Sequence, residues 1–346
     1  MANNAASGGT ASKNGKGSTT PETLLLGRRE IEKLLNMSQV LEAVENVFIL
    51  KAHGKAIMPP KIYLNLPEHN GDFRAMPAYI DGIAGVKWVS VYPDNYRYHL
   101  PSVLATIILC DPKTSYPLAI MDGTQITNLR TGAAGGIAVK YLARRDSTVI
   151  GLIGAGRQAR AQLLAISLVL PAIEEVKVFD QNEEAARRFA EAMGTELSLK
   201  VNTVKTVKAA AEADIVVTTT PSRKPFVKKQ YIRPGTHINA IGADAEGKQE
   251  LEADLLLGAK IVVDELEQAC HSGEINIPSA KGQIKVENIY STLGEVAAGM
   301  KKGRENDQEI TIFDSTGLAI QDMACAKLAY EKAKGQKDIP AFDFLS

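Results

Sequence analysis

The chain has 346 residues, of which 45% are apolar and 23% are charged, and its 40 basic side chains balance its 40 acidic ones. This is the composition of a globular protein of about two domains, and its balanced charge provides no basic surface for nucleic acid or for an acidic membrane. The longest apolar run, residues 103–110, is far shorter than the roughly 20 residues of a membrane-spanning helix, so we expect no nucleic acid and no membrane as partner.

The first 22 residues contain no aromatic side chain and no Val, Ile or Leu. Such a segment cannot bury enough apolar surface to offset the entropy lost on ordering, so we predict a disordered tail over residues 1–22. The tail also lacks the apolar centre of a signal peptide. The three cysteines lie far apart without zinc or redox spacing, which favours a reducing, cytoplasmic location.

The first part of the chain predicts helices followed by a mostly antiparallel sheet. Apolar residues recur at helical spacing over 28–54, with a break near Asn36. Between residues 55 and 125, short alternating strands are separated by Pro, Gly, Asn and Asp, which is typical of antiparallel strands. A helix is predicted from about Thr127, and its first turns contain the small residues TGAAGGIA.

The second part of the chain alternates β-branched strands with helix-like stretches, up to a last strand at 309–316. This alternation is typical of a doubly wound parallel sheet with crossover helices. The amphipathic stretch after it is expected to pack back on the first part. We therefore predict an α/β protein with a Rossmann domain over 137–316, and a smaller α+β domain with a mostly antiparallel sheet over 23–136 and 317–346.

A dinucleotide-binding turn is predicted where the strand STVIGLI ends. Gly154 makes the tight turn, Gly156 lets a pyrophosphate approach the backbone, and Ala159 is small enough for the next helix to pack on the strand. Arg157 and Gln158 begin that helix, whose free amides and dipole favour phosphate. An ordinary glycine turn is the alternative.

Asp180 supports a dinucleotide because it ends the next strand, 26 residues after Gly154, close to the roughly 20 expected. A carboxylate there accepts hydrogen bonds from both ribose hydroxyls and repels a 2′-phosphate, so we predict NAD rather than NADP. Thr218, Thr219 and Thr220 end a later strand at the same ligand-binding edge, with strand-end capping as the alternative role.

Arg130 and Thr131 stand in the glycine-rich helix of the other domain, from which Arg130 is expected to close over the pyrophosphate. A surface arginine is the alternative. The five histidines show no pairing at metal-ligand spacing, so no metal site is predicted.

Two cations interrupt apolar strand faces. In GVKWVSV, Lys87 shares one face of the predicted strand with Val89 and Val91. Arg74 similarly shares a face with Met76. Each cation either extends from the strand end to solvent or is held on an apolar face for a purpose, such as binding a carboxylate.

Segments throughout the chain, in order, resemble the ornithine cyclodeaminase/μ-crystallin family, and within it most closely the archaeal L-alanine dehydrogenases. The resemblance runs from Thr23 to about Lys334. It is carried by MPPKIYL, FRAMPAYI, GVKWVS, PLAIMDGTQITNLRTGAAGGIA, GLIGAGRQA, TTTPSRKP, THINAIGAD and EITIFDSTGLAIQD. It implies a homodimer in which the first domain supplies the substrate site and the dimer contacts.

The resemblance also implies catalytic roles for Lys87 and Asp244. Lys87 matches the family lysine that reaches the substrate carboxylate and the reacting carbon. Asp244 matches the family's essential aspartate, which orients and deprotonates the attacking water or handles the amine proton. For Asp244, a helix N-cap is the alternative.

The substrate-binding residues implied by the resemblance are Lys61, Arg74 and Met76. Alanine dehydrogenases carry an arginine at the position of Arg74, where ornithine cyclodeaminases carry an acid for the distal ammonium of ornithine. Arg74 therefore favours a small neutral amino acid. Lys248, preceded here by Ala-Glu-Gly instead of the family's Pro-Gly, and Ser315 are expected close to the nicotinamide.

We therefore expect NAD-dependent oxidative deamination of L-alanine to pyruvate and ammonium, and the reverse reductive amination. The expected partners are a small amino acid or 2-oxo acid, ammonium, and a second copy of the chain. The alternatives are a cyclodeaminase that converts ornithine to proline with bound NAD, a ketimine reductase, and a non-catalytic binding protein like μ-crystallin.

Overall fold

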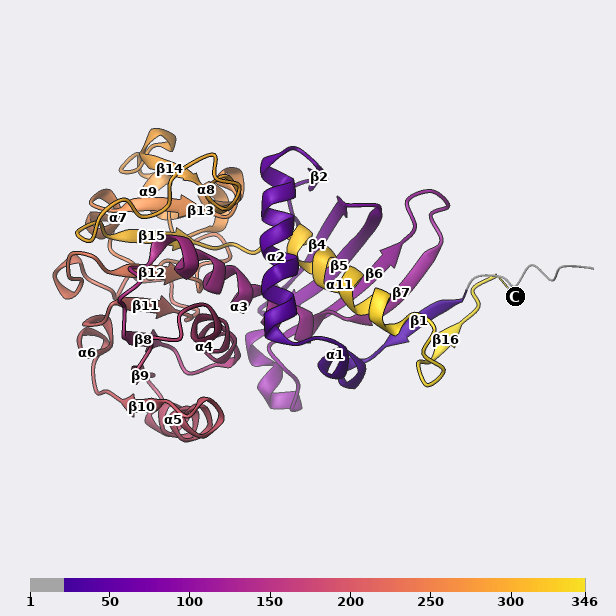
Figure 1. The fold of residues 1–346 in the computed structure, drawn as a ribbon, viewed down its shortest axis with the longest axis horizontal. Helices are drawn as coiled ribbons and strands as arrows, with labels where there is room; N and C mark the ends of the chain where they lie inside the picture. The colour runs from indigo at the N-terminus through magenta and orange to yellow at the C-terminus, as the bar shows by residue number, and fades with distance from the viewer. Residues whose placement is uncertain (1–21, 346) are drawn as a thin grey trace, which may run out of the picture.

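The computed structural model describes residues 22–345, so the predicted tail lies outside the described residues except for Glu22. Two sheets of eight strands each lie at opposite ends of the molecule, and the long helix α3 (Gly123–Leu142) runs between them (Figure 1). One sheet is parallel and the other is mostly antiparallel, which confirms the predicted fold class.

The first sheet has the strand order β16-β1-β7-β6-β5-β4-β2, and β3 pairs with β4. Its neighbours pair antiparallel, except that β1 runs parallel to β7. The sequence pattern does not predict β1, β2 and β16, because strands this short show no alternation. The strands are β1 (Thr23–Leu26), β2 (Ala56–Ile57), β3 (Ile62–Leu66), β4 (Gly71–Ile80), β5 (Ile83–Val91), β6 (Val103–Cys110), β7 (Pro117–Asp122) and β16 (Ala341–Phe342).

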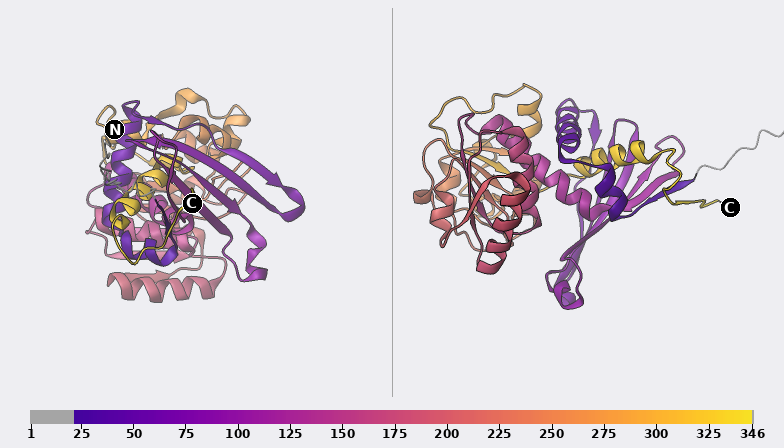
Figure 2. Two further views of the ribbon diagram at one scale, coloured as in Figure 1. Left: turned by 90° about the vertical axis from the view of Figure 1, so that its right-hand side faces the viewer. Right: turned by 60° about the horizontal axis from the view of Figure 1, so that its bottom comes forward.

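Helices cover one face of this sheet. The predicted break near Asn36 separates α1 (Arg28–Leu34) from α2 (Met37–Ala52), and the Asn36 side chain caps α2 by accepting from the amide of Gln39. Helix α11 (Ala319–Ala333) returns from the far end of the chain and lies across β4, β5 and β6 (Figure 2). The division into two domains at residue 137 stays a prediction, since α3 passes through that position without a break.

Helix α3 begins at Gly123, about a turn before the predicted start, because the carboxylate of Asp122 accepts hydrogen bonds from the first free amides. Its small residues are explained by a close contact with α4 (Arg157–Val169). A Cβ atom on Gly132 would lie only 2.4 Å from the carbonyl oxygen of Ala161 in α4. The glycine-rich run is therefore a helix-packing feature.

The second sheet is parallel throughout and has the order β10-β9-β8-β11-β12-β15-β13-β14, which confirms the predicted doubly wound arrangement. The sequence pattern does not predict its edge strand β14. The strands are β8 (Val149–Ile153), β9 (Glu175–Phe179), β10 (Lys200–Thr203), β11 (Ile215–Thr218), β12 (His237–Ala240), β13 (Lys260–Val263), β14 (Ile289–Thr292) and β15 (Thr311–Asp314). The remaining α-helices are α5 (Glu183–Leu197), α6 (Val207–Ala211), α7 (Ala253–Leu257), α8 (Leu266–Ser272), α9 (Asn276–Ala280) and α10 (Leu293–Ala297).

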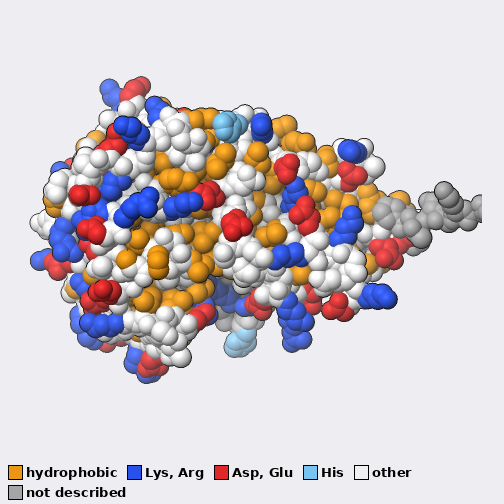
Figure 3. Space-filling model, viewed as in Figure 1, with side chains coloured by type: hydrophobic (Ala, Val, Ile, Leu, Met, Phe, Trp, Pro, Cys, Tyr) orange, Lys and Arg blue, Asp and Glu red, His pale blue; other side chains and the backbone are white. Residues whose placement is uncertain are grey.

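The surface agrees with the balanced composition. On the face shown in Figure 3, basic and acidic side chains are interspersed over both halves of the molecule. Within residues 22–345, none of the helices is long and apolar enough to cross a membrane.

We predict that Gly151→Ala destabilises the protein by about 1–3 kcal/mol, the usual cost of an overpacked core. An added Cβ on Gly151 of β8 would lie 1.9 Å from the backbone oxygen of Ala210 in α6, and neither backbone can move away easily. Gly258→Ala is the matched control, because its nearest neighbour would be 3.5 Å away. Urea unfolding measures both, and equal stability of the two variants would contradict the prediction.

Candidate active site

A cavity of about 730 Å³ lies between the two halves of the molecule and is lined by both. The first half contributes β4 and β5, helix α3 and the segment after β5, while the second half contributes the loops at the carboxyl ends of its strands. Most of the predicted site residues meet here. Those that line the cavity are Lys61, Arg74, Met76, Lys87, Arg130, Thr131, Gly156, Arg157, Gln158, Thr219, Thr220, Asp244, Lys248 and Ser315.

The glycine turn joins β8 to α4 at one side of this cavity. Gly154 has a φ of +105°, and its amide donates to the carbonyl of Phe179 at 2.8 Å. Gly156 precedes α4, and a Cβ atom there would meet nothing within 4 Å. Ala159 is fully buried beneath the turn. The turn therefore leaves free space beside the first amides of α4, as a bound pyrophosphate requires.

Asp180 does not line the cavity, but it is bound to the same turn. One carboxylate oxygen accepts from the amide of Ala155 at 2.9 Å, and the other accepts from the amide of Asn182 at 2.8 Å. These bonds hold the carboxylate beside the glycine turn. Each oxygen keeps a further lone pair, so the predicted ribose contacts remain compatible with this arrangement.

The three threonines after β11 have different environments. Thr219 and Thr220 line the cavity, whereas Thr218 is fully buried and donates to Glu250 at 2.6 Å. The same carboxylate accepts from the amide and hydroxyl of Thr220, both at 2.7 Å, and from the amide of Gly242 at 2.9 Å. Thr218 therefore fits the alternative strand-end role, because its hydroxyl faces Glu250 instead of the cavity.

Lys87 is buried on the inner face of β5, with only 1% of its surface exposed. Its ammonium lies 2.7 Å from Asp322 of α11 and 3.4 Å from the hydroxyl of Thr127. Burial and the nearby Arg130 lower the pKa of Lys87 to about 7, although Asp322 opposes this shift. Lys87 is therefore a lysine able to exchange a proton near neutral pH, and not one that extends to solvent.

Arg130 is buried in the cavity wall and bound to α11. Its Nε lies 3.1 Å from Asp322, and its Nη1 donates to the side-chain oxygen of Gln321 at 3.0 Å. Gly317 has a φ of +77°, and a Cβ atom there would lie 2.4 Å from the guanidinium. A glycine at this turn thus leaves room for Arg130, which faces the cavity as a fixed cation.

A second ion-pair network joins the halves of the molecule through Asp244. Its carboxylate accepts from Lys248 and, at 3.1 Å, from Arg74 of β4. Arg74 also donates to Asp72 at 2.6 and 3.2 Å. Burial opposes ionisation of Asp244, but Lys248 and Arg74 hold its pKa well below the ordinary value. Asp244 is therefore an ionised hydrogen-bond acceptor in this arrangement and a weak base.

Lys61 and Ser315 occupy the cavity near the β15–α11 turn. Lys61 donates to the carbonyl of Thr316 at 2.6 Å. Burial lowers the pKa of Lys61 to about 8, against the attraction of Asp264. The hydroxyl of Ser315 is buried and has no hydrogen-bond partner within residues 22–345, so it is free to bind a ligand.

The sequence interpretation missed Asp72, Asp322 and Glu250. Asp72 precedes Arg74 by two residues on the same strand, so strand alternation alone would have placed the two side by side. Asp322 shares its face of α11 with Ala319, Cys325 and Ala326, and a carboxylate on such an apolar face is a signal of a buried charge. No group of three or more potential metal ligands occurs among residues 22–345.

Comparisons with known proteins agree with this fold. The sequence model of the ornithine cyclodeaminase/mu-crystallin family matches residues 21–337. The chain is 55% identical over 315 residues to the alanine dehydrogenase of Archaeoglobus fulgidus, covering 90% of this chain and 95% of that protein. A solved archaeal alanine dehydrogenase dimer with bound NAD is 53% identical, with a TM-score of 0.90 and coverage of 93% and 99%. Delta(1)-pyrroline-2-carboxylate reductase of Thermococcus litoralis, solved with NADH and L-proline, is 47% identical, with a TM-score of 0.88 and coverage of 90% and 97%.

We predict that Gly156→Ala weakens NADH binding by roughly tenfold, about 1.4 kcal/mol, without lowering stability. The new methyl group meets no protein atom but enters the space beside the α4 amides. NADH fluorescence titration gives the affinity and thermal unfolding gives the stability, with Gly258→Ala as control. Unchanged NADH affinity would show that the turn does not hold the pyrophosphate.

Proposed function

The chain belongs to the ornithine cyclodeaminase/mu-crystallin family, and we propose that it is an NAD-dependent amino-acid dehydrogenase that interconverts L-alanine with pyruvate and ammonium. The observation that carries this proposal is Arg74, a buried guanidinium in the cavity wall. The acids beside it, Asp72 and Asp244, both accept hydrogen bonds from Arg74. Both carboxylates are already paired with a cation, which supports a small neutral substrate over a diamino acid that would need a free acid for its distal ammonium.

The residues present fit NAD as the cofactor. The open side of Gly156 and the amides of α4 suit the pyrophosphate, and the carboxylate of Asp180 suits an unphosphorylated ribose. The unpartnered hydroxyl of Ser315 suits a polar group at the nicotinamide end. When bound there, NAD supplies the acceptor for the hydride that leaves the substrate α-carbon.

The protein's own contribution is to hold the substrate and move protons. Lys61 and Arg74 provide the cations for the substrate carboxylate, and Met76 lies beside Lys87 on the paired strand. With a pKa of about 7, Lys87 in its neutral form takes a proton when water adds to the protonated imine, and it returns that proton when ammonia leaves. Asp244, held ionised, orients the water and the amine. One water enters and one ammonium leaves for each keto acid formed.

A cyclic imine reductase is the second candidate. It is supported by the 47% identity to the Thermococcus litoralis enzyme, whose structure was solved with L-proline. An amino acid and a cyclic imino acid both present one carboxylate and one nitrogen on the reacting carbon, so the same cations suit either.

The test is a substrate screen with NAD(H) and NADP(H), in which the products are identified by mass. Net NADH formation with alanine, together with pyruvate, supports the proposal. Reduction of pyrroline-2-carboxylate to proline in preference to amination of pyruvate supports the second candidate. Proline formed from ornithine without net NADH indicates a cyclodeaminase, and NADH binding without any turnover indicates a binding protein.

We predict that Lys87→Met lowers kcat at least about a hundredfold, the low end of the usual effect of a general acid–base. NADH affinity should stay unchanged, because Lys87 belongs to the substrate side of the cavity. Steady-state kinetics and NADH titration check this. A variant with wild-type kcat would remove Lys87 from the mechanism.

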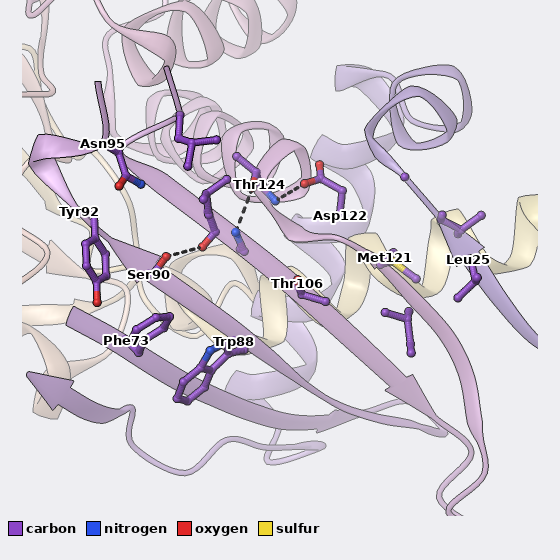
Figure 4. Close-up of a pocket in the computed structure, with 16 residues that line it drawn as sticks. Leu25, Phe73, Trp88, Ser90, Tyr92, Asn95, Thr106, Met121, Asp122 and Thr124 are labelled. Atoms are coloured by element: carbon purple, nitrogen blue, oxygen red, sulfur yellow. Dashed lines mark hydrogen bonds between the residues drawn. The ribbon is translucent and has the colours of Figure 1, made fainter. Parts of the chain in front are cut away.

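The outer face of the first sheet suits a second copy of the chain. A groove of about 900 Å³ crosses this face, and Trp88 is 44% exposed in it (Figure 4). The rings of Phe73 and Trp88 stack there at 5.2 Å between centroids. Such an exposed apolar surface is typical of a protein interface, and the similar archaeal structure is a dimer. Leu100 and Thr124 line both this groove and the active-site cavity.

We predict that Leu104→Glu converts a dimer into a monomer, because it places a charge among the apolar residues that line the outer groove. Leu168→Glu is the matched control, since Leu168 is exposed on α4 in the other half. Light scattering after gel filtration gives the mass of each. A Leu104→Glu protein that remains dimeric would place the interface elsewhere.

A further inference from the structure

We propose that Asp322 is a positioning residue of the reaction, which fixes the ammonium of Lys87 and the guanidinium of Arg130 in the cavity wall. The C-terminal helix α11 would then belong to the catalytic apparatus even though Asp322 itself does not line the cavity. The inference rests on the proposed function of Lys87 as the group that exchanges protons with the substrate.

The geometry is that of one carboxylate shared between two cations. Asp322 is fully buried, with one oxygen 2.7 Å from the Nζ of Lys87 and the other 3.1 Å from the Nε of Arg130. Lys87 comes from β5 and Arg130 from α3, so the carboxylate ties two elements of the cavity wall to a third. A lysine side chain has many rotamers, and this contact selects the one that keeps Nζ at the cavity.

A glycine on β5 allows Asp322 of α11 to lie close to Lys87. Gly85 lies two residues before Lys87 on the same face of β5. A Cβ atom on Gly85 would lie 2.6 Å from the sulfur of Met323, the residue after Asp322. The missing side chain lets the first turn of α11 approach the strand closely.

The charges around Lys87 determine what the Asp322 carboxylate does. Arg130 on α3, Lys61 before β3 and burial all disfavour the protonated form of Lys87. The carboxylate of Asp322 on α11 opposes these effects and favours that form. The neutral neighbours of Lys87 include the hydroxyl of Thr127, the side chain of Met76 on the paired strand β4, and the buried Cys325 thiol of α11, whose pKa is raised by burial and by Asp322. Removing the negative charge therefore leaves two cations without their shared partner, and Lys87 loses its proton at a lower pH.

The first experiment compares wild type with Asp322→Asn, which keeps the shape of the side chain and removes its charge. We expect kcat to fall by at least about tenfold, while the NADH dissociation constant is unchanged. In the pH profile of kcat/KM, the ionisation assigned to Lys87 should move to lower pH by about one unit or more. An unchanged profile with only a lower thermal stability would show a structural role and overturn the proposal.

The second experiment needs no turnover, so it separates this inference from the proposed function. Carbon-13 at the lysine Cε gives an NMR signal for each ammonium, and the Lys87 signal is assigned by its loss in Lys87→Arg. Its titration midpoint should be lower in Asp322→Asn than in wild type. Equal midpoints would overturn the proposal, whatever substrate the enzyme uses.

Two further variants complete the test. Asp81→Asn removes a different ion pair to α11, the exposed one with Lys327, and should change neither kcat nor the Lys87 midpoint. Asp322→Glu keeps the charge but displaces it, so kcat should fall while Lys87 titrates closer to wild type. This variant keeps the proposal testable if Asp322→Asn does not fold, and a wild-type kcat in Asp322→Glu would contradict it.

Discussion

A charged group inside a protein is tolerated only with a partner, and this constraint organises the centre of the molecule. Leaving one member of a buried ion pair alone costs about 3–5 kcal/mol. Lys87 and Arg74 are almost completely buried, and each lies beside a carboxylate that a second cation shares. Asp322 and Asp244 therefore act as bridges. Lys87 therefore gains its carboxylate only when α11 packs on the first sheet, whereas Arg74 has Asp72 on its own strand and reaches Asp244 only when the two halves meet.

The two halves of the molecule meet through these bridges and through packed helices. Helix α3 begins at the antiparallel sheet and packs along α4 of the parallel sheet, with glycines at the closest contact. Helix α11 begins where β15 of the parallel sheet ends and lies across the other sheet. Helix α3 and the β15–α11 turn, which both connect the two halves, line the cavity, and they fix the strand ends of the parallel sheet relative to Lys61 and Lys87.

Local patterns in the sequence predicted the features that depend on interactions between residues close together in the chain. Strand alternation placed Lys87 on an apolar face, and the glycine spacing located the turn before α4. The alternation of strands and helices gave the parallel sheet. What the sequence could not show depends on tertiary contacts. Thr218 ends its strand as predicted, but Glu250, 32 residues later, draws its hydroxyl away from the cavity. Asp322 is 235 residues from Lys87, and no local pattern links them.

The wall shared by the outer groove and the inner cavity has a consequence for protein engineering. Leu100 and Thr124 line both the outer groove and the active-site cavity, so the two spaces are adjacent at these residues. A larger or smaller side chain at Leu100 alters both volumes at once. Redesign of the cavity at this position would thereby also change the surface proposed for the second copy, whereas Arg74 and Lys61 line the cavity and not the outer groove.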